Sequence, residues 1–345
     1  MSTAQGYKIH MSHDRPLRLG ILGTARIVPK ALLQPAREVP EVEILAIASR
    51  DPVRAREFAA LHRIPRIFSS YEKLMNAPEI DAIYIPLPNS MHCEWTIRCL
   101  RAGKHVLCEK PIACNAAEAA LMADAAAQTS RVLSEAFHYQ YHPLAIHIRD
   151  LIKSGKIGDL RHIEVEFSAP IAEPNIRYDL GLGGGATMDL GCYGLNMIRF
   201  FSGVTPHVRR AIASIGPPEI DVTMAAELEL PNGAMAFMKC SMASDAQVSV
   251  FFRAIGTDGE IHVTNPVAPQ LGHVLTIRHG SHQIRKSVAG ASTFVYQLRA
   301  FAAAIRGKCT LTSGPTEAIA NMELIDRVYR VAGLKPRGVE NQRLI

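Results

Sequence analysis

Residues 106–111 read Val-Leu-Cys-Glu-Lys-Pro, so that an apolar strand runs directly into an acid, a lysine and a proline. Parallel α/β sheets place their ligands at the carboxyl ends of the strands, which is where Lys110 then stands. Pro111 keeps Lys110 out of the helical region, and X-Pro bonds adopt the cis form at appreciable frequency. The stretch predicts a parallel sheet with Lys110 aimed into a cleft. A surface lysine before a helix-starting proline is the simpler alternative.

Residues 18–28, upstream, read Arg-Leu-Gly-Ile-Leu-Gly-Thr-Ala-Arg-Ile-Val and predict a short buried strand, a turn and the start of a helix. This is a degenerate form of the Gly-x-Gly-x-x-Gly dinucleotide fingerprint. Amides at a helix start can hold a phosphate. The residues that we expect to contact a dinucleotide here are Gly23, Thr24, Ala25, Arg26 and Ile27.

The next predicted strand, over residues 42–48, ends at the position that distinguishes NAD(H) from NADP(H). An NAD-preferring site usually has a carboxylate there, whereas this chain has Ser49 and Arg50, with Arg54 one helical turn later. A hydroxyl beside guanidinium groups binds a 2′-phosphate, and a carboxylate repels it. Asp51 is better placed as the N-cap of the following helix. We therefore predict NADP(H) as the preferred cofactor and NAD(H) as the alternative.

A third strand–helix unit and a further strand complete the N-terminal part. Residues 82–92 read Ala-Ile-Tyr-Ile-Pro-Leu-Pro-Asn-Ser-Met-His, and an amphipathic helix then leads to a strand over residues 104–108. Strands that alternate with helices at this rhythm form a doubly wound parallel sheet. We therefore predict an α/β protein whose dinucleotide-binding Rossmann domain covers residues 17–138, after a polar tail over residues 1–16.

From Arg161 the hydrophobic pattern changes to a period of two, which predicts β-strands. Residues 231–233 (Pro-Asn-Gly) and 257–259 (Thr-Asp-Gly) are turns between such strands. We predict a substrate and oligomerisation domain of the α+β class over residues 139–333, with an open, mostly antiparallel sheet of about five or six strands. A tail over residues 334–345 follows.

Two of these strands, over residues 234–242 and 248–254, are apolar on both faces. One face should pack on the helices of the domain, and the other would expose an apolar area too large for a monomer. The sequence therefore predicts a homodimer or homotetramer that associates through this sheet.

A glycine run at residues 183–185 precedes a helix that is predicted to begin near Ala186. On this helix Asp189, Tyr193 and Asn196 share one face because of their helical spacing. An Asp-x-x-x-Tyr pair is also common on an ordinary half-buried helix. The glycine run, which opens room for a ligand, favours a functional interpretation.

The composition limits the class of protein. With 48% hydrophobic and 20% charged residues, the 345-residue chain is an ordinary globular protein of roughly two domains. No apolar run reaches the roughly 18 residues of a membrane span, and we expect no signal peptide. Seven cysteines without a Cys-x-x-Cys motif predict free thiols and a cytoplasmic protein.

The net charge of +6 raises the question of nucleic acid. The Lys and Arg residues are scattered without a basic-aromatic pattern, so we expect a small-molecule partner, with no nucleic acid and no membrane. His138 and His142 form an i, i+4 pair, but Pro143 interrupts the helix that would hold it. Because no carboxylate or cysteine completes a ligand set, we predict no metal site.

In this order and spacing the motifs resemble the glucose–fructose oxidoreductase, inositol dehydrogenase and MocA family of pyridine-nucleotide oxidoreductases. The similarity covers nearly the whole chain, from Leu17 to about Gly333. Its most specific elements are Pro88-Asn89-x-x-His92, Ala102-Gly103-Lys104-His105-Val106, Glu109-Lys110-Pro111, and Asp189-Leu190-Gly191-Cys192-Tyr193 after the glycine run. The tyrosine at position 193 resembles the branch with D-xylose dehydrogenases, dimeric dihydrodiol dehydrogenases and nucleotide-sugar ketoreductases.

The resemblance implies roles for these residues. Lys110 and Tyr193 would flank the reacting carbon beside the nicotinamide, and the Lys110–Pro111 bond would be cis. The residues that would line the cofactor are Leu87, Pro88, Asn89, His92 and Glu109.

The chain departs from the family at the crossover into the second domain. His138 and Gln140 stand where methionine and arginine are usual, which removes a positive charge near the nicotinamide and adds a proton donor. We therefore assign His138, Gln140 and Asn196 to substrate binding.

Together these patterns predict an NADP(H)-dependent oxidoreductase that transfers a hydride between the nicotinamide and a secondary alcohol, hemiacetal or ketone of a sugar. Tyr193 would be the general acid/base, Lys110 would lower the pKa of its phenol, and Asp189 would bind a substrate hydroxyl or fix Lys110. Three alternatives stay open: a dihydrodiol dehydrogenase acting on a cyclic diol, a non-catalytic cofactor-binding regulatory protein, and a glycosidase that oxidises and re-reduces its substrate. The presence of both Lys110 and Tyr193 argues against the second, and a glycosidase would favour a carboxylate at Ser49.

Overall fold

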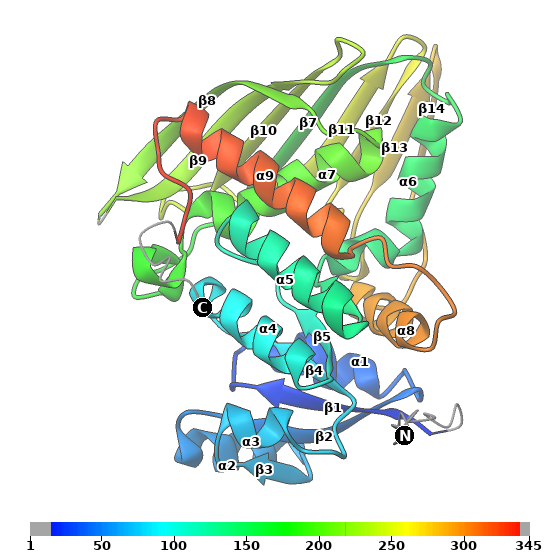
Figure 1. The fold of residues 1–345 in the computed structure, drawn as a ribbon. Coiled ribbons are helices and arrows are strands. Elements are labelled where there is room, and N and C mark those ends of the chain that lie inside the picture. The colour runs from blue at the N-terminus through cyan, green and yellow to red at the C-terminus, as the bar shows by residue number, and fades with distance from the viewer. Residues whose placement is uncertain (1–14, 218, 339–345) are drawn as a thin grey trace, which may run out of the picture.

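A computed structural model describes residues 15–217 and 219–338 of the chain. What the sequence predicts for residues 1–14 and 339–345 lies outside the described residues. Within them, two sheets are stacked through layers of helices (Figure 1).

The N-terminal half is built on a six-stranded parallel sheet with the order β3-β2-β1-β4-β5-β6. Its strands are β1 (Leu17–Leu22), β2 (Val42–Ala48), β3 (Arg66–Phe68), β4 (Ala82–Ile85), β5 (His105–Cys108) and β6 (Leu133–Glu135). The connecting helices are α1 (Gln34–Ala36), which continues a π-helical turn over Pro29–Leu33, and α2 (Pro52–His62), α3 (Tyr71–Met75), α4 (His92–Arg101) and α5 (Ala116–Thr129). The order reverses between β1 and β4, which confirms the predicted doubly wound sheet and puts its switch point beside the turn after β1.

The C-terminal half is built on an eight-stranded sheet with the order β14-β13-β12-β11-β7-β10-β9-β8. Its strands are β7 (Leu160–Ser168), β8 (His207–Gly216), β9 (Ile220–Glu229), β10 (Met235–Ser241), β11 (Ser249–Gly256), β12 (Gly259–Thr264), β13 (Leu275–His279) and β14 (His282–Lys286). Only β7 and β10 pair in parallel, so the sheet is mostly antiparallel as predicted.

The strand count corrects the prediction of about five or six strands. One strand that the sequence pattern does not show is β8, in which buried and exposed side chains do not alternate regularly. Its register against β9 shifts twice, between Val208 and Arg210 and between Ser214 and Ile215, and these irregularities break the period of two.

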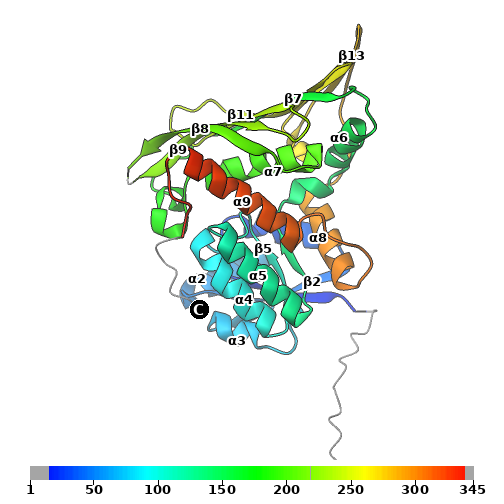
Figure 2. The ribbon, with the colours of Figure 1, turned by 45° about the horizontal axis from the view of Figure 1, so that its top comes forward.

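Four further helices follow the crossover between the halves, which is a short turn over His138–Tyr141. They are α6 (Pro143–Lys153), α7 (Cys192–Ser202), α8 (Thr293–Ile305) and α9 (Pro315–Val331). Helices α7 and α9 lie between the eight-stranded sheet and the N-terminal half (Figures 1 and 2). Helix α8 returns to the first half, where Phe294, Val295 and Leu298 share a core cluster with Leu19 and Ile21 of β1. The second half thus reaches the carboxyl edge of the parallel sheet from two directions.

The opposite face of the eight-stranded sheet carries no helix in the described part of the chain (Figure 2). Phe237 and Phe251 are half-buried on it, next to Lys239 and Arg253. Lys239 pairs with Glu166 at 3.1 Å, and Arg253 pairs with a second acid on the same face. The expectation that these strands are apolar on both faces was therefore wrong in part, because charged pairs surround the outward-facing phenylalanines.

The ends of the described chain are anchored. Arg15 pairs with Asp81 at 2.6 Å, and the buried guanidinium of Arg337 pairs with Asp221 and donates to the backbone oxygen of Gly184. Residues 334–338, predicted as part of a tail, are therefore held against the second half. In the described residues no helix is long and apolar enough to cross a membrane.

Candidate active site

A cavity of about 500 Å³ lies between the carboxyl edge of the parallel sheet and the segment that leads into α7. It is lined by Thr24, Ala25, Arg26, Ile27, Arg54, Pro86, Leu87, Pro88, Asn89, Glu109, Lys110, His138, Pro174, Asn175, Ile176, Arg177, Leu182, Gly184, Gly185, Met188, Asp189, Tyr193 and Phe294. It therefore joins the predicted dinucleotide turn to the three predicted catalytic side chains.

Lys110 reaches this cavity from the end of β5. The Lys110–Pro111 peptide bond is cis, as the resemblance implied. The carbonyl oxygen of Pro111 lies 2.9 Å from Nδ1 of His92, and Nε2 of the same ring lies 2.7 Å from the carbonyl oxygen of Leu87. His92 is fully buried and does not line the cavity. The structure thus places it behind the wall, where it ties together the segments that carry Leu87 and Lys110.

Asp189 is bound by two cations. Nζ of Lys110 donates to its backbone oxygen at 2.6 Å and to Oδ1 at 2.8 Å, and Nε of Arg177 donates to Oδ2 at 2.5 Å. Burial alone would raise the pKa of Asp189, but the charges of Lys110 and Arg177 outweigh it, and the pKa falls to about 2. Of the two roles expected for Asp189, the structure shows that it fixes Lys110. The three groups together carry one excess positive charge.

Tyr193 lies at the inner end of the cavity with its hydroxyl 3.2 Å from Nε2 of His138. Nζ of Lys110 lies 4.9 Å from the centre of the Tyr193 ring, over its face. Burial, and next the negative charge of Glu109, raise the pKa of Tyr193 well above its usual value. This corrects the expectation that Lys110 lowers the pKa of the phenol. The ammonium is bound by Asp189 and faces the ring of Tyr193 instead of its hydroxyl.

Glu109 lines the cavity next to Lys110 and accepts a hydrogen bond from the hydroxyl of Tyr84 at 2.6 Å. Burial raises the pKa of its carboxyl, and the hydrogen bond from Tyr84 and the charge of Lys110 oppose this only in part. The carboxyl therefore takes up a proton more readily than an exposed glutamate does.

The turn after β1 forms the other end of the cavity and fits a dinucleotide. Gly23 has φ +90°, and a Cβ there would lie 3.1 Å from a methyl of Leu87, so the turn favours glycine. Residues 24–27 and Arg54 line the space beyond it. A glycine turn with guanidinium groups beside it is chemically suited to a pyrophosphate and a ribose phosphate.

The three residues predicted to contact the ribose 2′-phosphate divide into two groups. Arg54 lines the cavity, whereas Ser49 and Arg50 do not. Arg50 lies against Tyr71, where its charge opposes the rise that burial causes in the tyrosine pKa. Asp51 accepts hydrogen bonds from the amides of Val53 and Arg54, at 2.9 and 3.1 Å. This confirms Asp51 as the N-cap of α2.

Gln140 and Asn196 do not reach the cavity, although the sequence assigned both to substrate binding. Both are buried, and Oδ1 of Asn196 accepts from Nε2 of Gln140 at 2.7 Å and from the hydroxyl of Tyr139 at 2.6 Å. A turn of π-helix over Thr187–Gly191 replaces the first part of the expected regular helix, so that Asp189 and Asn196 no longer lie on one regular helix. His138, the third assigned residue, does line the cavity.

The cavity is also lined by Arg177, Asn175 and Phe294, which were not predicted from the sequence. Arg177 and Asn175 lie in an irregular loop that closes over Asp189, and Phe294 lies in the first turn of α8. A single arginine in a loop gives no periodic signal. The only sequence feature near it was the glycine run, because a Cβ on Gly184 would lie 2.4 Å from the backbone oxygen of Arg177.

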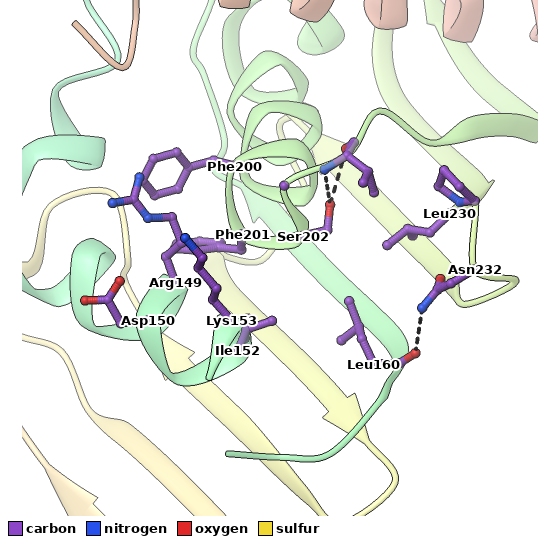
Figure 3. A pocket seen from close by; sticks show the side chains of 13 residues that line it. Arg149, Asp150, Ile152, Lys153, Leu160, Phe200, Phe201, Ser202, Leu230 and Asn232 are labelled. Atoms are coloured by element: carbon purple, nitrogen blue, oxygen red, sulfur yellow. Dashed lines mark hydrogen bonds between the residues drawn. The ribbon is translucent and has the colours of Figure 1, made fainter. Parts of the chain in front are cut away.

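A second cavity, of about 750 Å³, lies at the other end of α7 (Figure 3). Phe200 and Phe201 form its wall together with Leu160 and Leu230, and the guanidinium of Arg149 lies over the Phe200 ring at 4.9 Å. It contains none of the predicted site residues. Among residues 15–217 and 219–338, no group of three or more His, Cys, Asp or Glu side chains is placed to hold a metal ion.

Comparisons with known proteins agree with this geometry. Residues 17–137 match the model of an oxidoreductase family with an NAD-binding Rossmann fold, and residues 146–262 match the GFO/IDH/MocA C-terminal domain. The chain is 34% identical over 321 residues to a D-xylose 1-dehydrogenase (NADP⁺) of Haloferax volcanii, covering 92% of this chain and 97% of that one. It is 34% identical to a trans-1,2-dihydrobenzene-1,2-diol dehydrogenase of Xenopus laevis, over 65% of this chain and 68% of that one.

Among solved structures, the 3-ketoreductase KijD10 of Actinomadura kijaniata in complex with NADP and TDP-benzene is similar with a TM-score of 0.85. The sequence identity is 27%, and the similarity covers 93% of this chain and 98% of that chain. The family match over both halves, the nearly complete alignment and the cavity at the switch point agree, and the chain therefore belongs to the GFO/IDH/MocA family of NAD(P)-dependent oxidoreductases.

Proposed function

We propose that this protein is an NADP(H)-dependent oxidoreductase that transfers a hydride between nicotinamide and a secondary alcohol, hemiacetal or ketone of a sugar or sugar derivative. The observation that carries the proposal is one cavity with the glycine turn and Arg54 at one end and Lys110, Asp189 and Tyr193 at the other. The similarity to a D-xylose dehydrogenase and to a 3-ketoreductase that binds NADP supports both the cofactor and the substrate class.

The cofactor, when bound, supplies or accepts the hydride. The protein positions the substrate oxygen and handles its proton. Lys110 is held by Asp189 with its ammonium beside the Tyr193 ring, so it stabilises negative charge on a reacting oxygen placed there. The hydroxyl of Tyr193 gives or takes the proton. Arg177 and Asn175 also line the cavity and offer donors to further hydroxyl groups of a sugar.

A dihydrodiol dehydrogenase is the second candidate, and the cavity has an observation in its favour. Ile176, Leu182, Met188 and Phe294 add apolar side chains to the lining, which suits a cyclic diol. The similarity to the Xenopus laevis enzyme points the same way. Both candidates use the same proton chemistry, so only the substrate distinguishes them.

A substrate panel tests the proposal. D-Xylose, other aldoses, inositols, trans-1,2-dihydrobenzene-1,2-diol and sugar ketones are each assayed at 340 nm with NADP⁺ or NADPH and with NAD⁺ or NADH. We expect turnover of at least one sugar with NADP(H). Turnover confined to the cyclic diol would favour the second candidate. Cofactor binding without turnover of any compound would instead support a non-catalytic binding protein.

The cofactor preference is tested on Arg54. Of the three residues predicted to contact the ribose 2′-phosphate, only Arg54 lines the cavity. Loss of one charge-assisted contact costs about 1.5–3 kcal/mol. Arg54→Ala should therefore weaken NADP(H) by about ten-fold to a hundred-fold and barely change NAD(H), as measured by calorimetric titration. Arg56→Ala, an exposed residue two positions along the same helix, is the matched control. Equal weakening of both cofactors would contradict a 2′-phosphate contact. Arg50→Ala then shows whether the residue against Tyr71 contributes.

A further inference from the structure

His138 connects the catalytic tyrosine to a buried hydroxyl. Its Nε2 lies 3.2 Å from the hydroxyl oxygen of Tyr193, and its Nδ1 lies 2.8 Å from Oγ1 of Thr293. The imidazole stacks on the ring of Phe294, with the ring centres 4.0 Å apart. Three elements therefore place three side chains in a row: the crossover turn, α7 and the start of α8.

Neither member of the Tyr193–His138 pair is charged at neutral pH. Burial, and next the charges of the nearby cations Lys110 and Lys30, lower the pKa of His138 to about 3. Burial raises the pKa of Tyr193, as do Glu109, Cys192, Asp189 and Tyr139 around it. A neutral imidazole has one N–H and one free lone pair. Each partner can therefore exchange one proton with the other.

We propose that His138 is the proton-accepting partner of Tyr193, with its Nδ1–H donated to Thr293 and its Nε2 lone pair facing the phenol. This inference rests on the proposed function. When an alcohol is oxidised, the carbon-bound hydrogen leaves with its electron pair to the nicotinamide, which is the only redox change. The substrate O–H bond breaks as its proton bonds to the oxygen of Tyr193, and the O–H bond of Tyr193 breaks as that proton bonds to Nε2. Ketone reduction runs the same transfers in reverse.

The alternative is that Tyr193 acts by itself as a phenolate. Because its pKa lies above the usual value of about 10, fewer than about one molecule in a thousand would be a phenolate at pH 7. The neutral imidazole is present in nearly every molecule at that pH. The charges of Lys110 and Lys30 disfavour the protonated form of His138. The imidazole therefore releases the proton that it has accepted, and this proton reaches water through the cavity that His138 lines.

Thr293 has a positioning role in this arrangement. Its side chain is fully buried at the first residue of α8. An oxygen that accepts from Nδ1–H keeps the proton on that nitrogen and leaves Nε2 free for the phenol. Thr293→Val removes this acceptor at nearly constant volume, so it should reduce the preference for one tautomer without emptying the site.

The hydrogen-bond pair is tested without activity, by ¹⁵N NMR of protein labelled in its histidine rings. The His138 signals are those lost in His138→Met. In the wild type we expect the His138 ring to be neutral from pH 5 to 9, with the proton on Nδ1. The Nε2 signal should shift in Tyr193→Phe, and Thr293→Val should show a mixture of the two tautomers. The buried His105 ring serves as the unaffected control. The proposal would be overturned if the His138 ring became protonated near pH 6.5, or if its Nε2 signal did not shift in Tyr193→Phe.

Kinetics test the proton transfer, using D-xylose with NADP⁺ or, if that pair is inactive, the panel compound with the highest turnover. Tyr193→Phe should lower kcat by about 10²–10⁴. His138→Met and His138→Gln, which also cannot take the proton, should each lower kcat by at least ten-fold with unchanged KM for NADP⁺. Their activity should rise steadily up to pH 10, as a phenolate mechanism requires. The wild type should be flat from pH 6 to 9.

The double variant shows whether Tyr193 and His138 act together or independently. His138→Met combined with Tyr193→Phe should be no slower than Tyr193→Phe alone, because the histidine acts through the tyrosine. A His138→Met enzyme with the kcat and pH profile of the wild type would refute the proton-accepting role. If the wild type turned over no compound, the proposed function would fail, while the NMR measurement would still decide whether the pair exists.

Discussion

Asp189 is the residue on which the geometry of the site depends. It holds the ammonium of Lys110 with one carboxylate oxygen and the guanidinium of Arg177 with the other. Without this carboxylate, two cations would face each other in a cavity wall that excludes much of the solvent. The ammonium would then be free to move towards the phenol of Tyr193, which is the contact that the sequence predicted.

We therefore expect Asp189→Asn to destabilise the fold as well as to slow the reaction. Breaking a buried ion pair costs about 3–5 kcal/mol, and the lower end applies because Arg177 is partly exposed. The effect has a pH signature. The pKa of Asp189 is depressed to about 2 in the folded state, so its stabilisation is complete above the unfolded value of 3.8 and is lost as the pH falls through 2.

Urea unfolding between pH 2 and 7 measures both effects. The gap between wild type and Asp189→Asn should close as the pH approaches 2. Asp124→Asn, an exposed acid on α5, is the control and should stay within about 0.5 kcal/mol of the wild type. An Asp189→Asn variant as stable as this control at pH 7 would show that the ion pairs contribute nothing to folding.

At the scale of elements, the glycine run before α7 does more than make room for a ligand. Gly184 lines the cavity, but it also lets the loop with Arg177 approach, since a Cβ there would lie 2.4 Å from the backbone oxygen of Arg177. Gly185 has φ +124° and stands against Asp221. The glycine run therefore sets the position of the loop whose Arg177 binds Asp189.

Gly184→Ala should push this loop outward, because the obstructing atom belongs to the backbone and cannot rotate away. Overpacking of this kind costs about 1–3 kcal/mol. The expected result is a lower thermal midpoint and a raised KM for the substrate, with cofactor affinity unchanged. Gly181→Ala lies in the same loop and meets only the flexible side chain of Asp179, at 3.3 Å, so it is the matched control. Equal stability of the two variants would count against this role for Gly184.

At the scale of the whole molecule, the outer face of the eight-stranded sheet remains the surface through which we predict a homodimer or homotetramer. Phe237 and Phe251 lie on adjoining positions of this face, each next to a strand β7 glutamate. The surrounding ion pairs reduce the apolar area, so the interface would be a mixed one. A stable association would bury at least about 1,000 Å².

Light scattering at micromolar concentration measures the assembly. The wild type should have the mass of a dimer or tetramer, and Phe237→Lys with Phe251→Lys should shift it towards the monomer. Leu61→Lys, at a residue that is 76% exposed on α2 in the other half, should leave the mass unchanged. A monomeric wild type would refute the prediction.

The sequence by itself determined what depends on local patterns. The strand, turn and helix around Gly23, the cap at Asp51 and the turn at Gly233 all follow from residue type and periodicity, because each is stabilised by contacts within a few positions of the chain. The family motifs also pointed to Lys110, Asp189 and Tyr193, which the structure brings into one cavity.

Only the tertiary structure decided which atoms these side chains meet. Tyr193 and His138 are 55 positions apart, and His138 and Thr293 are 155 apart, so no local pattern relates them. Whether Lys110 binds a phenol or a carboxylate depends on where the Arg177 loop and α7 pack against β5. Such contacts are set by the packing of separate elements, and burial then fixes the charges, which is why the pKa of Tyr193 rises where the sequence alone predicted a fall.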